Sequence, residues 1–98
     1  MKAVFIAYNQ ALTEAVSSIL ERQHIRGYTK WADVHGRGTN SGEPHFGNHT
    51  WPAMNSAILA VIEDEQVDPL LASLKKLDSK AEKQGLRAFV WNVEDCNA

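Results

Sequence analysis

The chain has 98 residues, of which 44% are hydrophobic and 22% charged, so its composition suits one globular domain over residues 1–98 and excludes a disordered or fibrous protein. Its formal net charge of −2 argues against binding to bulk nucleic acid or to an anionic membrane. No apolar run approaches the roughly 20 residues that span a bilayer, and a single cysteine, Cys96, excludes an internal disulfide. We therefore expect a soluble, cytoplasmic domain.

The first third of the chain predicts a strand, a helix and a second strand. Ala3–Tyr8 is a compact apolar run, which is typical of a buried strand. Asn9 stands where a helix N-cap belongs, and apolar residues then recur in pairs four positions apart as far as Leu20. We expect Gly27 to end this helix.

The predicted second strand covers Tyr28–His35, where side chains alternate between two faces. Simple alternation places Tyr28 and Val34 on one face and Trp31 on the other. From Gly36 to Trp51 the chain is rich in glycine, asparagine and serine and offers almost nothing to build a core. Long loops of this kind in a small domain are usually functional.

The last part of the chain predicts one strand, one helix and a final strand. Ser56–Ile62 is almost continuously apolar, as a buried strand requires. Asp68 and Pro69 are suited to the N-cap and the first position of a helix. The alternative is a helix that begins slightly before them. Gly85 stops this helix, and Leu86–Val93 forms the fourth strand.

This order of elements is β-α-β-β-α-β, which predicts an α+β, ferredoxin-like sandwich. We expect a four-stranded antiparallel sheet with two helices on one face and the long loop between strands two and three. Two helices cover only one face of such a sheet. Trp31, Phe89 and Trp91 are candidates for the open face, and an apolar open face favours self-association.

Candidate ligand-binding residues concentrate in the long loop. Gly36 and Gly38 allow the backbone to approach a ligand, with Arg37 between them as a phosphate partner, although a plain turn explains this pattern equally well. The histidines His35, His45 and His49 are candidate metal ligands, and solvated loop histidines are the simpler interpretation.

Evidence for catalysis in the sequence is thin. Ser41 and His45 are four residues apart in the loop, without a nucleophile motif or an orienting acid. We therefore expect a protein that is not an enzyme, with a hydrolase built on this pair as a weak alternative.

Three local motifs resemble the P-II nitrogen-regulatory proteins. Val34–Gly38 is similar to the family's V-x-G-x-G segment, Ile62–Val67 is similar to its acidic strand-to-helix junction, and Phe89–Glu94 resembles its F-V-x-x-V-E strand. The resemblance spans nearly the whole chain in the right order. It implies a homotrimer of ferredoxin-like subunits with small-molecule sites in the clefts between subunits. The loop at residues 36–51 would then be the T-loop, which contacts target proteins and changes shape with the bound ligand.

The resemblance also implies roles for individual residues. Gly36, Arg37 and Gly38 would help to line an adenine-nucleotide site. Asn40 keeps the amide that helps to bind magnesium and 2-oxoglutarate in the family. Arg87 would replace the lysine that grips phosphate before the final strand.

The sequence also departs from the family pattern. The glycine-rich phosphate loop before the last strand is reduced to one glycine, Gly85, and residues 36–51 contain no tyrosine for uridylylation. We therefore expect a P-II-like regulatory protein for a small anionic ligand, such as an adenine nucleotide, that controls a transporter or an enzyme. The alternative is a metal-binding or metal-sensing trimer similar to the CutA proteins, with a divalent metal held by His35, His45 and His49.

Overall fold

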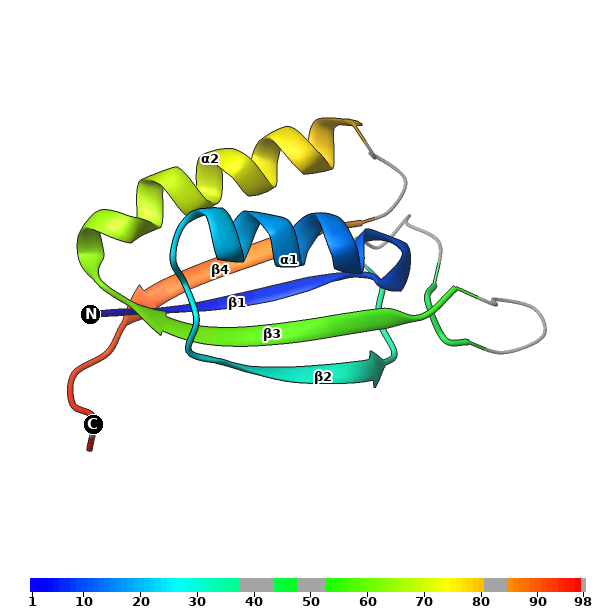
Figure 1. Cartoon of the computed structure of the whole chain (residues 1–98). Coiled ribbons are helices and arrows are strands. Elements are labelled where there is room, and N and C mark those ends of the chain that lie inside the picture. Colours follow the sequence, from blue (N-terminus) through cyan, green and yellow to red (C-terminus); the bar gives the residue numbers. More distant parts are fainter. Residues whose placement is uncertain (38–43, 48–52, 81–84, 98) are drawn as a thin grey trace.

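The computed structural model describes residues 1–37, 44–47, 53–80 and 85–97. Four strands and two α-helices follow one another in the predicted order, with a short 3₁₀ helix, η1, before the first α-helix (Figure 1). The elements are β1 (Lys2–Asn9), η1 (Gln10–Leu12), α1 (Thr13–Arg22), β2 (Tyr28–Val34), β3 (Asn55–Ile62), α2 (Asp64–Lys80) and β4 (Arg87–Asn92).

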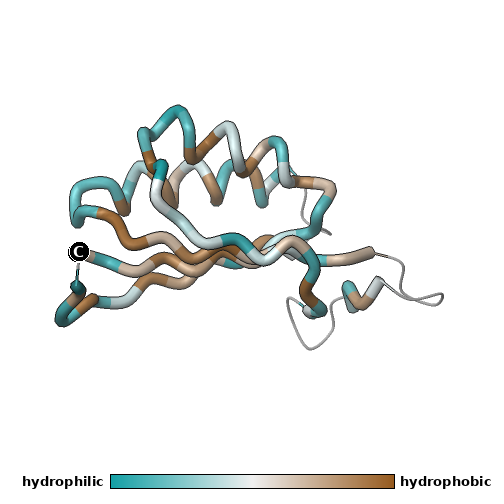
Figure 2. Tube along the Cα trace, turned by 60° about the horizontal axis from the view of Figure 1, so that its bottom comes forward, coloured by the Kyte–Doolittle hydropathy of each residue, from teal (hydrophilic) through white to brown (hydrophobic). Residues whose placement is uncertain are grey.

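The strands form one antiparallel sheet in the order β2-β3-β1-β4. Both helices lie on the same face of this sheet (Figures 1 and 2). The predicted ferredoxin-like α+β sandwich is therefore confirmed. No helix among the described residues is long and apolar enough to cross a membrane.

The hydrophobic core lies between the sheet and the helices. On β1 every second side chain points into it, and Val4, Ile6 and Tyr8 are completely buried. α1 and α2 meet the sheet with the apolar faces that their sequences predict. The buried residues of the two helices are Val16, Ile19, Leu20, Leu70 and Leu74.

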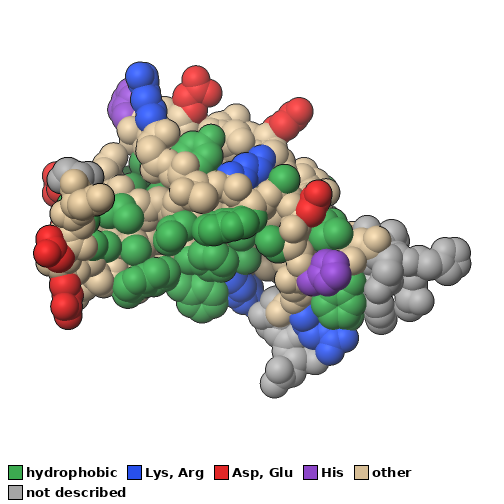
Figure 3. Space-filling model, turned by 90° about the horizontal axis from the view of Figure 1, so that it is seen from below, with side chains coloured by type: hydrophobic (Ala, Val, Ile, Leu, Met, Phe, Trp, Pro, Cys, Tyr) green, Lys and Arg blue, Asp and Glu red, His purple; other side chains and the backbone are tan. Residues whose placement is uncertain are grey.

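The opposite face of the sheet is uncovered and strongly apolar, as Figure 3 shows. Trp31, Phe89 and Trp91 are 44%, 57% and 50% exposed, which confirms their predicted place on the open face. Soluble monomers rarely leave so many large apolar side chains together in water, so this face is a candidate interaction surface.

The first helix begins and ends differently from the prediction. The Asn9 side chain accepts a hydrogen bond from the Ala11 N–H, at 2.9 Å, so it caps η1 rather than α1. α1 ends at Arg22, well before Gly27. The left-handed residue beyond its end is His24, with φ of 57°, and not the predicted glycine.

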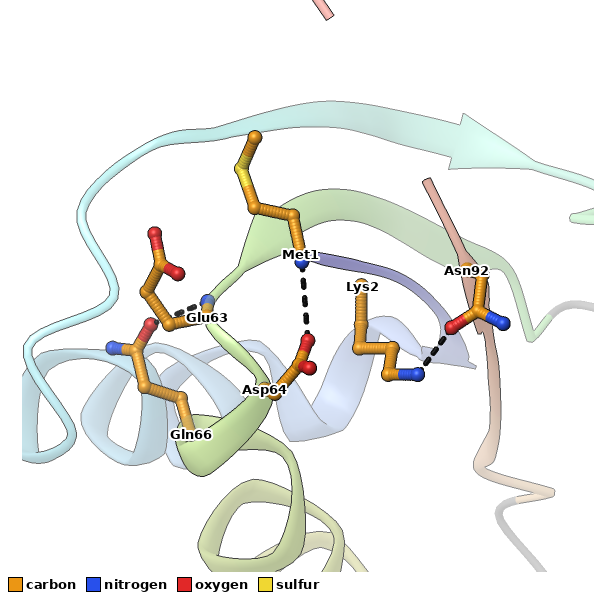
Figure 4. A network of polar contacts seen from close by, with 6 residues as sticks. All are labelled: Met1, Lys2, Glu63, Asp64, Gln66 and Asn92. Atoms are coloured by element: carbon orange, nitrogen blue, oxygen red, sulfur yellow. Dashed lines mark hydrogen bonds and ion pairs between the residues drawn. The ribbon is translucent and has the colours of Figure 1, made fainter. Parts of the chain in front are cut away.

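The second helix begins at Asp64, so Pro69 lies inside it. Two hydrogen bonds fix this start: the Glu63 N–H donates to Gln66 Oε1 at 3.0 Å, and the Gln66 N–H donates to the Glu63 carbonyl at 3.0 Å (Figure 4). The Gln66 side chain thus forms one half of a capping box, while the Gln66 N–H bonds to the backbone rather than to the side chain of Glu63. The helix therefore begins before Asp68, and Pro69 removes one of its internal hydrogen bonds.

Strand β2 contains an irregularity that the alternation rule did not predict. Trp31 pairs with Ala57 and Val34 pairs with Asn55, with a register shift between them. Ala57 and Asn55 share a face of β3 because they are two residues apart. Trp31 and Val34 therefore lie on the same face, where simple alternation placed them on opposite faces.

Candidate ligand-binding site

A cavity of about 430 Å³ opens on the uncovered face of the sheet, where β1 and β2 end and β3 and β4 begin. Its wall combines aromatic side chains, small residues and two arginines. The lining residues are Phe5, Ala7, Trp31, Val34, His35, Gly36, Arg37, Asn55, Ala57, Gly85, Arg87 and Phe89.

Three of the five predicted ligand-binding residues, Gly36, Arg37 and Arg87, line this one cavity. Gly36 and Arg37 lie just beyond the end of β2, after His35, and Arg87 begins β4. Because β2 and β4 are the two edge strands, the arginines approach the cavity from opposite edges of the sheet. The other two predicted residues, Gly38 and Asn40, lie outside the described residues.

Arg87 is held at the cavity by its own strand and by α2. Its Nη1 donates to the Leu86 carbonyl at 3.0 Å and lies 3.9 Å from Asp78 Oδ2. Both contacts within the described chain use Nη1, so the rest of the guanidinium can meet a ligand. The side chain is thus oriented in advance, and it retains donors for an anion.

The aromatic part of the wall comes from three of the four strands. Phe5 of β1 lies directly opposite Phe89 of β4, and Trp31 projects from β2 on the same face. Apolar and cationic side chains meet at this end of the sheet (Figure 3). A flat ring that carries an anionic group suits such a wall, because the ring packs on the aromatic side chains and the anion meets the guanidinium groups.

The loop is more structured at its base than its composition suggests. Gly36 and His45 exchange backbone hydrogen bonds of 3.1 and 2.6 Å, and the Gly47 N–H donates to the Ala53 carbonyl at 2.8 Å. Pro44 and His45 are buried. The segment at residues 44–47 therefore lies as a short extended piece between residues 36 and 54.

Two side chains join this segment to the cavity wall. His45 is 4% exposed, and its Nδ1 lies 2.5 Å from Oδ1 of Asn55, which is 5% exposed. Gly36 packs so closely on this amide that a Cβ atom there would collide with Asn55 Nδ2. The close approach seen at Gly36 is to Asn55, and its predicted approach to a ligand stays a prediction.

The two candidate metal ligands that the structure describes, His35 and His45, each contact a neighbouring side chain. The His35 ring packs against Phe46 with centroids 5.6 Å apart, and Nδ1 of His45 is engaged by Asn55. His49 lies outside the described residues, as does Ser41, so the Ser41–His45 pair is untested. Within the described ranges, no group of three or more His, Cys, Asp and Glu side chains could hold a metal ion. The metal-binding alternative therefore gains no support.

Sequence reasoning did not identify Asn55 as a site residue. The sequence did contain a signal, because Asn55 is the polar residue at the start of the apolar strand Asn55–Ile62. Trp31 and Phe89 were expected on the open face, but their place in the cavity depends on the pairing of β1 with β4 and on the irregularity in β2.

The ferredoxin-like fold and its order of strands agree with a family comparison. The sequence profile described as "Nitrogen regulatory protein P-II" matches residues 1–98. The chain therefore belongs to the P-II family of regulatory signalling proteins, which confirms the resemblance found in its motifs.

Solved structures of PII-like proteins share the fold. CPII from Thiomonas intermedia K12, bound to ADP, AMP and bicarbonate, is 23% identical with a TM-score of 0.75, covering 94% of this chain and 84% of that one. Its apo form is 21% identical with a TM-score of 0.66, covering 94% and 89%. A PII-like protein from Thermus thermophilus is 22% identical with a TM-score of 0.66, covering 94% and 85%. No protein of curated function matches the chain.

Proposed function

We propose that this chain is a homotrimeric regulator that binds an adenine nucleotide in the cavity at Gly36, Arg37 and Arg87. Occupancy of the cavity would change the loop at residues 36–51 and so control a partner protein in the cytoplasm. The observation that most directly supports this function is the convergence of the three residues on one cavity from two edge strands. Gly38 and Asn40 remain predicted members of the site.

The chemistry of the wall supports a nucleotide as the ligand. The two arginines supply charge-assisted hydrogen bonds to phosphate, and the aromatic residues supply an apolar surface for a base. CPII, which has the same fold, is bound to ADP, AMP and bicarbonate, and all three are anions. A binding and signalling role needs no catalytic residue, and we propose none.

The trimer is supported by the uncovered face of the sheet. Its exposed aromatic side chains need cover that the two helices do not give, because both helices lie on the other face. The cavity opens on this same face. Association through the sheet would therefore place the ligand between subunits and close the cavity around it.

Replacing Arg87 tests the site. We expect Arg87→Ala to weaken ADP binding by roughly 10- to 100-fold, because a hydrogen bond to a charged group contributes about 1.5–3 kcal/mol. Isothermal titration calorimetry measures the affinity, and native mass spectrometry counts subunits and bound nucleotides.

The matched control is Arg26→Ala, which removes the same charge from an exposed position away from the cavity. This control should bind ADP like the parent protein, and both variants should keep the parent's oligomeric state. Unchanged ADP affinity in Arg87→Ala would contradict the assignment of Arg87, and a parent protein that binds no adenine nucleotide would contradict the proposed ligand.

A further inference from the structure

One wall of the cavity is also the base that holds the segment at residues 44–47. His35, Gly36 and Asn55 line the cavity. The same three residues make the contacts to this segment: His35 through the Phe46 ring, Gly36 through the backbone of His45, and Asn55 through the His45 side chain. A ligand that touches this wall therefore touches the supports of the loop segment.

The contact between Asn55 and His45 pairs an amide oxygen with a ring nitrogen. Because Asn55 Oδ1 accepts, His45 donates across the 2.5 Å contact when its ring is in the Nδ1–H tautomer. This contact turns the amide so that Nδ2 lies against Gly36. Nδ2 of Asn55, the donor end of its amide, is thus held at the cavity wall by the contact with His45.

Burial makes this arrangement sensitive to disturbance. Asn55 and His45 are 5% and 4% exposed, and a buried polar group that loses its partner is costly. Gly36 leaves no free space beside the amide, because even a methyl group there would collide with it. The amide therefore cannot shift without moving either the His45 side chain or the backbone of Gly36, and these two residues also share two backbone hydrogen bonds.

We propose that Asn55 is a positioning residue that couples occupancy of the cavity to the segment at residues 44–47. This inference rests on the proposed function, since it needs a ligand in the cavity. An acceptor group of the ligand holds the Asn55 amide in place, the amide holds His45, and His45 keeps its backbone pairing with Gly36. Without a ligand the amide is held by His45 alone, and the pairing of His45 with Gly36 then opens more often.

Two substitutions of His45 separate this coupling from simple packing. In His45→Asn the side-chain nitrogen occupies the place of Nδ1 and can still donate to Asn55. In His45→Gln the nitrogen reaches the place of Nε2, so the donor at the correct position is lost although the side chain stays polar and similar in size. Asn55→Leu removes both ends of the amide, and thermal unfolding shows whether that variant folds.

Hydrogen exchange reports the coupling directly. The amides of Gly36, His45 and Gly47 donate the hydrogen bonds at the base of the loop. We expect ADP to slow their exchange about tenfold in the parent protein and in His45→Asn. ADP should leave the exchange unchanged in His45→Gln and Asn55→Leu, whereas calorimetry on the same samples should show that His45→Gln still binds ADP.

The outcomes distinguish this inference from the proposed function. Equal protection by ADP in His45→Gln and His45→Asn would overturn the coupling and leave nucleotide binding intact. If ADP binds the parent protein without slowing these three amides, the coupling is likewise wrong. If neither ADP nor AMP binds the parent protein, the proposed function fails first and the coupling fails with it.

Discussion

At the scale of single residues, Gly36 shows how a close contact selects glycine. Its backbone passes directly over the Asn55 amide, which is itself held by buried His45. The chain also contains Gly27, where an added Cβ would meet no atom within 4 Å. The two glycines therefore form a matched pair that separates lack of space from the general flexibility of glycine.

We expect Gly36→Ala to lower the free energy of unfolding by about 1–3 kcal/mol, because the methyl group displaces the Asn55 amide from His45. Gly27→Ala should leave stability unchanged or raise it by up to about 1 kcal/mol. Urea denaturation of both variants measures the difference. Equal destabilisation by the two substitutions would show that the contact with Asn55 does not determine the loss of stability at Gly36.

Residue types predicted part of the site, and packing determined the rest. Gly36 was predicted from the backbone freedom of glycine, and Arg87 from its alignment with the lysine that grips phosphate in the family. Asn55 was missed because its importance comes from two neighbours, Gly36 and His45, that lie far from it in the sequence. His45, which was predicted as a metal ligand, is buried and bonded to Asn55, a contact that spacing alone does not reveal.

At the scale of elements, periodicity predicted both α-helices and all four strands of the described chain but not the local departures. The strands and apolar helix faces follow from patterns of two and of 3.6 residues. The irregularity between Trp31 and Val34 depends on the pairing of β2 with β3, which no local pattern records. The short segment at residues 44–47 was missed for the same reason, since its partners are residues 36 and 53–54.

The start of α2 is joined to β1 by charge. The Met1 ammonium lies 3.1 Å from Asp64, and its hydrogen bond and charge hold the pKa of the Asp64 carboxyl below its usual value (Figure 4). Slight burial opposes this lowering of the pKa, and the charge of Lys2 adds to it. Because the folded pKa is lowered, the ionised carboxylate favours the folded state.

Asp64→Asn should therefore lower the melting temperature at pH 7. The difference from the parent protein should shrink as the pH falls below about 4, where the unfolded carboxyl takes up its proton, and it should vanish below the lowered pKa of the folded state. The control is Asp68→Asn, which removes a carboxylate from the same helix but no ion pair within the described chain. Thermal unfolding at a series of pH values from about 7 down to about 2 checks this, and a difference that does not shrink as the pH falls would exclude the ion pair as its cause.

At the scale of the whole molecule, the uncovered face of the sheet carries both the cavity and the proposed subunit contact. Trp91 lies on this face, 50% exposed, but does not line the cavity. A substitution at Trp91 therefore tests the proposed trimer without replacing a residue that lines the cavity.

We expect Trp91→Asp to dissociate the trimer into monomers at micromolar concentration, because a buried aromatic contact at an interface is commonly worth about 2 kcal/mol or more. Ala72→Asp places the same charge on the exposed surface of α2 and should not affect assembly. Native mass spectrometry and light scattering measure the masses. A trimer that survives Trp91→Asp would place the subunit contact elsewhere.

The central place of β1 in the sheet has a consequence for synthesis of the chain. β1 pairs with β3 on one side and with β4 on the other, so the ribosome makes it long before either neighbour exists. During that time its apolar residues and both rows of its backbone groups are open to other chains. A chaperone that protects the nascent protein should therefore bind residues 2–9. The pairing of β1 is therefore complete only when β4, the last strand to be made, joins the sheet.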